Sequence, residues 1–170
     1  MTLSTRFSTV AVAVLGMIGM GVGTGSASAE TANGGTVPLT SVLRACNFAP
    51  KQFVGTNATG SGQVTIGTHG SNTVTADITF AIGRPDTAYN VRLIQGPRPG
   101  TQTCNAGEPG VAFAVLNTDG NGTGAVNLHD SVRQGYTNAW VFIEGPTDYG
   151  ADVGQIRGEY YTSQNPISIQ

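Results

Sequence analysis

The chain has 170 residues, of which 11% are charged, and a formal net charge of −2. This length is sufficient for one domain with a hydrophobic core of its own. Lysine occurs only at Lys51, and no basic cluster is present to follow a phosphate backbone, so the composition argues against nucleic acid as a partner.

The first 29 residues predict an export signal. Arg6 supplies a positive start, residues 10–23 (VAVAVLGMIGMGVG) form an uncharged apolar run, and residues 27–29 (ASA) are small enough for a signal peptidase. The run is too short and too rich in glycine to span a bilayer. We expect cleavage before Glu30, which removes Arg6 and takes the net charge from −2 to −3. The mature protein is then secreted or held in the cell envelope, without a membrane span.

Glycine and proline determine the expected organisation of the mature chain. Residues 30–38 (ETANGGTVP) predict a flexible N-terminal tail, and residues 39–170 predict a single β domain. Within residues 30–170, the longest stretch free of glycine and proline is 71–82, so an ordinary helix of ~11–12 residues has almost no room. Residues 42–48 predict either a further strand or a short helix capped by residues 40–41.

The strands are predicted from the alternation of apolar and polar residues. They are expected over 63–66, 73–82, 89–95, 111–116, 126–128, 139–143 and 155–161. Residues 111–116 and 139–143 are apolar on both faces, which is typical of central strands covered on two sides. The pattern predicts an all-β fold, an antiparallel β-sandwich or closed barrel of about seven or eight short strands. The expected core residues are Val74, Ile78, Phe80, Val91, Leu93, Phe113, Val115, Val141 and Ile143.

An up-and-down path would sort the connections between the two ends of the sandwich. One end would then contain residues 68–72, 96–110 and 130–138, and the other residues 83–88, 119–124 and 145–154. The second end would carry four acidic residues and one base, namely Asp86, Asp119, Asp148, Asp152 and Arg84.

Cys46 and Cys104 are the two cysteines of the chain, and export favours pairing them. The alternative is a redox-active or metal-bound thiol pair, but no Cys-x-x-Cys spacing supports it. The sequence therefore predicts a structural disulfide that closes a long loop. Such a bridge stabilises a fold by roughly 4 kcal/mol in the chain-entropy account.

The glycine-rich stretch 119–124 (DGNGTG) has the spacing of a calcium-binding loop. Asp119, Asn121 and Thr123 supply oxygen side chains at alternate positions, and Asp130 stands at the twelfth place. The flanking segments predict strands, whereas such a loop needs helices. A β-hairpin turn explains the same residues and is our expectation, with calcium as the alternative.

Residue patterns for catalysis are sparse. The chain contains no Gly-x-Ser-x-Gly elbow, and the adjacent residues 129–131 (HDS) would point in opposite directions on an extended segment. No motif for a cofactor is present. Carboxylates such as Glu144, Asp148 and Glu159 leave a hydrolase acting on envelope material as an alternative.

Four segments together resemble a group of small exported actinobacterial proteins of mycobacterial type. They are 85–95 (PDTAYNVRLIQ), 104–110 (CNAGEPG), 116–122 (LNTDGNG) and 139–146 (AWVFIEGP). The resemblance covers most of residues 40–162 and implies export and a β-rich fold, with no activity. A more distant similarity is to secreted CHRD-type β domains, although the histidines expected in the strand that matches 89–95 are absent.

These observations predict a secreted, non-enzymatic β-sandwich that acts by binding or as a component of the cell envelope. The partner and the oligomeric state remain open, and no cofactor is expected. The first alternative is a calcium-stabilised adhesion module that uses residues 119–130. The second is the envelope-directed hydrolase.

Overall fold

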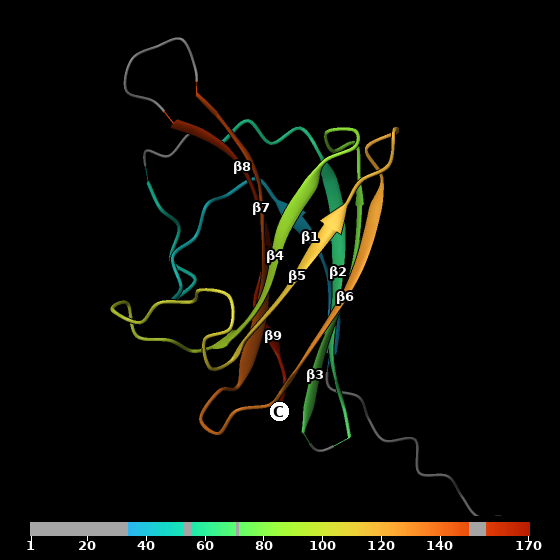
Figure 1. Ribbon diagram of the computed structural model, residues 1–170. Coiled ribbons are helices and arrows are strands. Elements are labelled where there is room, and N and C mark those ends of the chain that lie inside the picture. Colours follow the sequence, from blue (N-terminus) through green and yellow to red (C-terminus); the bar gives the residue numbers. More distant parts are fainter. Residues whose placement is uncertain (1–33, 53–55, 71, 150–155) are drawn as a thin grey trace, which may run out of the picture.

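The computed structural model describes residues 34–52, 56–70, 72–149 and 156–170, and this part of the chain is all-β (Figure 1). Its nine strands are β1 (Gly34–Thr40), β2 (Ser61–His69), β3 (Thr73–Ala81), β4 (Ala88–Gly96), β5 (Val111–Asn117), β6 (Gly124–Ser131), β7 (Asn138–Tyr149), β8 (Ile156–Ser163) and β9 (Ile167–Ser168). The all-β prediction is confirmed, and each of the seven strands expected from alternation is present. The predicted signal peptide, residues 1–29, lies outside the described residues.

The strands form one continuous sheet in the order β5-β4-β7-β8-β1-β2-β3-β6, with β9 beside β7. Strand β1 connects two layers, because residues 34–38 pair with β2 while Leu39 and Thr40 pair with β8. The first layer therefore contains β1, β2, β3 and β6, and the second contains β5, β4, β7 and β8. Every ladder is antiparallel, and the sheet is a nearly closed sandwich.

The prediction of a flexible tail over residues 30–38 is wrong for residues 34–38, which belong to β1. Val37 and Leu39 of this strand pack against the core, and its backbone pairs along β2. Gly34, Gly35 and Pro38 weaken the local strand signal, so pairing between distant segments decides the structure here. Residues 30–33 lie outside the described part.

The segment 41–52 forms neither the strand nor the capped helix expected from residues 42–48. It is an irregular turn in which Arg44 and Pro50 make an isolated backbone bridge. The Lys51 amide donates a 2.8 Å hydrogen bond to the Leu43 carbonyl. This turn brings Arg44 and Lys51 to the same side of the second layer.

The hydrophobic core lies between the two layers and contains seven of the nine predicted residues, namely Val74, Ile78, Phe80, Val91, Leu93, Val141 and Ile143. The placement of Phe113 and Val115 in the core is wrong, since these side chains are 47% and 43% exposed. Strand β5 lies at an end of the sheet and directs Leu116 inward, and its outward residues Phe113 and Val115 are left uncovered.

The described connections gather at the two ends of the sandwich as the up-and-down path predicts, except that residues 145–149, expected in a connection, belong to β7. At one end the Asp86 amide donates a hydrogen bond to the Asp119 carbonyl, and at the other the Thr137 amide donates to the Gly96 carbonyl. Asp152, expected at the first of these ends, lies outside the described residues.

Candidate functional site

A groove of about 460 Å³ lies on the outer face of the second layer. Its floor consists of outward-facing side chains that the register of β4, β7 and β8 brings side by side, namely Arg92, Ile94, Trp140, Phe142, Glu144 and Tyr160. The segment 41–52 and the loop 97–110 supply the walls. This volume falls within the ~300–1,000 Å³ that is typical of small-molecule sites.

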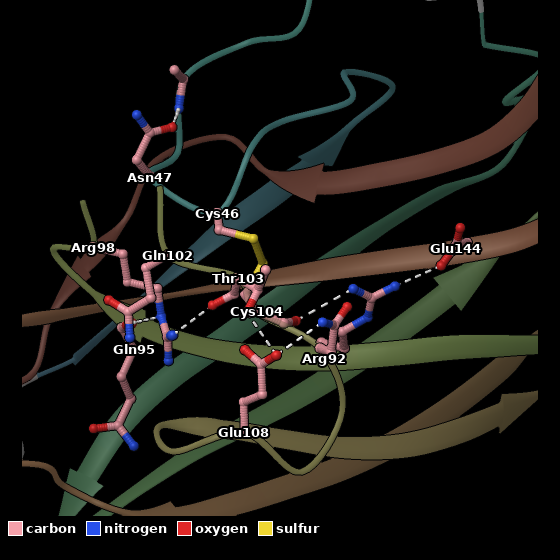
Figure 2. The surroundings of a disulfide bond; sticks show 12 residues. Cys46, Asn47, Arg92, Gln95, Arg98, Gln102, Thr103, Cys104, Glu108 and Glu144 are labelled. Atoms are coloured by element: carbon pink, nitrogen blue, oxygen red, sulfur yellow. Dashed lines mark hydrogen bonds and ion pairs between the residues drawn. A yellow bond between two sulfur atoms is a disulfide. The ribbon is translucent and has the colours of Figure 1, made fainter. Parts of the chain in front are cut away.

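The disulfide between Cys46 and Cys104 joins the two walls of the groove, and the predicted pairing is confirmed (Figure 2). Beneath it, a second apolar cluster is formed by Ile94, Cys104, Val111, Trp140 and Phe142. Phe48 meets Trp140 edge to face, with ring centroids 5.2 Å apart. The outer face of β7 is therefore covered by irregular segments, which explains why its sequence is apolar on both faces.

Arg98 holds the loop 97–110 in shape from within. Its side chain is only 5% exposed, and it donates hydrogen bonds of 2.7–2.9 Å to the carbonyls of Gln95, Thr103 and Pro109. The Glu108 carboxylate accepts hydrogen bonds from the side chains of Thr103 and Asn105, at 2.7 and 2.8 Å (Figure 2). The bond from Thr103 is the main reason that the pKa of Glu108 is lowered. The wall is thus a defined structure without helix or strand.

Arg92 on the groove floor already has its partners. Its Nη2 lies 2.6 Å from Oε2 of Glu144, and its Nη1 donates a 3.3 Å hydrogen bond to the Cys104 carbonyl (Figure 2). The guanidinium carbon also lies 4.9 Å from the centre of the Phe142 ring. The charge of Arg92 is therefore balanced by Glu144.

Arg44 and Lys51 carry charges that the described part of the chain does not balance with a salt bridge. The Arg44 guanidinium carbon lies 4.0 Å from the centre of the Phe48 ring, and its Nη1 donates a 3.1 Å hydrogen bond to the Phe48 carbonyl. Its Nε is buried and has no hydrogen-bond partner, and burial lowers the pKa of Arg44. Lys51 is exposed at the rim. The groove therefore has two positive charges in excess.

Tyr160 gives the groove a flat, partly exposed aromatic surface. Its ring stacks on Phe142, with centroids 6.0 Å apart and an angle of 18° between the planes. Glycine is required two residues earlier, because a Cβ at Gly158 would overlap the Tyr160 ring. Burial and then the charge of Glu144 raise the pKa of Tyr160.

A larger depression of about 730 Å³ lies over β1, β2, β3 and β6 of the first layer. In the part of the chain that the structure describes, no charged side chain lines it, and its aromatic residue, Phe80, is 1% exposed. A ligand there would meet neither a charged group nor an exposed aromatic ring among the described residues, so volume alone does not make this depression the better candidate.

The four residues with calcium-loop spacing are not brought together. Oδ1 of Asp119 accepts hydrogen bonds from the backbone amides of Asn121 and Thr123, each at 2.9 Å, and these bonds lower the pKa of Asp119. Asp130 lies near the far end of β6. Because a strand rises ~3.3 Å per residue, it is about 20 Å from Gly124, where the strand begins. Among the described residues, no group of three or more His, Cys, Asp or Glu side chains is placed to hold a metal ion.

The carboxylates of the hydrolase alternative lie on different faces of the sheet. Glu144 faces outward into the groove, opposite Tyr160 in the register of β7 and β8. Glu159 is fully buried between the layers, where its Oε2 lies 2.9 Å from Nε of Arg84. These two carboxylates do not share a cleft, and the side chain of Asp148 lies outside the described part.

Comparison with protein families, with characterised proteins and with solved structures finds no match for this chain. The resemblance to small exported actinobacterial proteins and to CHRD-type domains therefore stays a prediction. Within the described ranges, no helix is long and apolar enough to cross a membrane.

Proposed function

We propose that the protein is a secreted, non-enzymatic β-sandwich that binds a ligand in the outer-face groove, outside the cell or as a component of its envelope. The observation that carries this proposal is the excess of positive charge beside the partly exposed ring of Tyr160. The disulfide joins the two walls of the groove, and the buried Arg98 holds the loop 97–110 in shape. Such preorganisation favours binding because little conformational freedom is lost when the ligand enters.

The arrangement of acidic groups favours binding over catalysis. Among the described residues, Glu144 is the one carboxylate that lines the groove, and it is paired with Arg92 at 2.6 Å. A paired carboxylate of this kind is a poor general base, and Glu159 lies on the opposite face. Two facing carboxylates, as a glycosidase requires, are not available from Glu144 and Glu159.

Export is supported by the pattern of residues 1–29 and by the disulfide, since disulfides persist in oxidising compartments. We expect the protein in culture supernatant or envelope washes with Glu30 as its first residue. Mass spectrometry of the purified protein tests this directly. Recovery of a cytosolic form that retains Met1 would contradict the proposal.

The groove is tested by blocking it. Soluble fragments prepared from the envelope of the producing cell are titrated into the secreted protein, and binding is followed by calorimetry. Thr101→Trp places a bulky ring in the exposed groove wall, whereas Thr79→Trp places the same ring on the exposed face of the first layer. We expect the first variant alone to lose binding. Equal binding by both variants, or loss only in Thr79→Trp, would refute the groove as the site.

A further inference from the structure

Arg44 and Lys51, the two groove cations without a salt bridge in the described chain, lie on one short turn. The bridge between Arg44 and Pro50 and the hydrogen bond from Lys51 to Leu43 fold the segment 41–52 back on itself. Both side chains then line the same wall, across the groove from the loop 97–110. A ligand in this position gains from a negative charge, because charge-assisted hydrogen bonds are about twice as strong as neutral ones.

The unmet hydrogen-bonding capacity of Arg44 points to the same conclusion. Its Nε is buried without an acceptor. A donor that lacks a partner is unfavourable in the folded state. A planar carboxylate matches the geometry of a guanidinium and accepts two of its N–H groups at once.

The remaining groups of the groove match a hydroxylated ring. The face of an aromatic ring is negatively polarised, so the Tyr160 ring offers a surface for the C–H groups of a saturated ring. On the facing wall, Thr101, Thr103 and Asn105 are exposed hydroxyl and amide side chains. Within the described chain, the Thr101 hydroxyl and the Asn105 amide oxygen have no hydrogen-bond partner, so both can bind ligand hydroxyls. An aromatic acid would leave these polar groups unused.

We propose that the groove binds an acidic sugar, a saturated hydroxylated ring that carries a carboxylate. This inference rests on the proposed function, since it names the ligand of the same site. Arg44 and Lys51 bind the carboxylate, Tyr160 stacks on the ring, and Thr101 and Asn105 hydrogen-bond to its hydroxyls.

The experiment is a calorimetric titration of the secreted protein with digalacturonate and with the same disaccharide after its carboxyl groups are reduced to alcohols. We expect digalacturonate to bind and the reduced sugar to bind at least about tenfold more weakly, with affinity falling as salt is added. Arg44→Gln and Lys51→Gln should each weaken digalacturonate binding by about tenfold. Arg133→Gln, a change of the same kind at an exposed position outside the groove, should leave it unchanged.

Benzoate and inorganic phosphate are the other two probes. Equal binding of the reduced sugar, or binding of benzoate or phosphate as tight as that of digalacturonate, would overturn the acidic-sugar assignment. Absence of digalacturonate binding would overturn it as well. The proposed function would survive that result if Thr101→Trp still abolished the binding of envelope fragments, and it would fail together with the assignment if it did not.

Discussion

The Tyr89 hydroxyl donates a 2.9 Å hydrogen bond to Oε1 of Glu159, which is 70 residues further along the chain and fully buried. Tyr161 donates a second hydrogen bond to the same oxygen at 2.5 Å. Phe80 packs edge to face on both tyrosines, with centroids 5.1 and 4.8 Å away. The buried carboxylate thus ties β4 to β8 inside the core, and its role is structural.

Replacement of the buried carboxylate should therefore destabilise the fold. Glu159→Gln removes the negative charge beside Arg84 and places an amide that cannot accept all the same donors, so we expect a loss of roughly 1–3 kcal/mol. Glu144→Gln makes the same change in the partly exposed pair with Arg92 and should cost less than about 1 kcal/mol. Urea unfolding of both variants measures the difference. Equal losses would show that Glu159 is not a structural centre.

Stability should fall in strongly alkaline solution. Burial, as the largest cause, raises the pKa of Tyr89 to about 12, whereas an unfolded tyrosine titrates near pH ~10. The folded state holds the proton more tightly, so this stabilisation is complete below about pH 10 and is lost as the pH rises through about 12. Unfolding free energies from about pH 9 to about pH 12 test this. Tyr89→Phe should flatten the decline, and an unchanged slope would contradict the assignment.

Loss of the ring should destabilise the protein far more at Phe80 than at Phe113. Phe80→Ala empties a site that is 1% exposed and should cost ~3–5 kcal/mol. Phe113→Ala removes a side chain that is 47% exposed and should change stability by less than about 0.5 kcal/mol. Denaturant unfolding compares them directly. A large loss at Phe113 would mean that the outer face of β5 is covered by a partner.

Calcium should not stabilise the protein. Oδ1 of Asp119 is already engaged by two backbone amides, and Asp130 lies far along β6. We expect the same melting temperature in excess EDTA and in ~10 mM calcium, a concentration well above the weak dissociation constants of extracellular calcium sites. A rise of several degrees that disappears in Asp119→Ala would restore the adhesion-module alternative.

Local patterns predicted the parts of this fold that depend on local chemistry. Alternation placed seven strands and the inward residues of β3 and β4, because side chains on a strand point to opposite faces in turn. Strand β1 was not predicted, because Gly34, Gly35 and Pro38 weaken the local strand signal. Phe113 was misplaced because its sequence context does not reveal that β5 lies at the end of the sheet.

The sequence did not predict the groove, because its residues come together only in the folded structure. Cys46 and Cys104 identified the two segments that form its walls, and no motif identified its cations. Arg44 and Tyr160 are ordinary residues in the sequence, and only the register of β7 with β8 and the disulfide bring them to one place. The calcium-like spacing is not realised, since β6 stretches residues 124–131 apart. The β-hairpin expected around residues 119–124 is wrong, because β5 and β6 belong to different layers and pair with β4 and β3, respectively.

The most direct test of the groove as the binding site is a map of the backbone amide shifts of the secreted protein on titration with digalacturonate. The largest shifts should fall on residues 43–46, 100–105 and 160, and β2 and β3 should be unaffected. Shifts confined to the depression over β1, β2, β3 and β6 would contradict this account, as would the absence of any saturable shift with both digalacturonate and soluble envelope fragments.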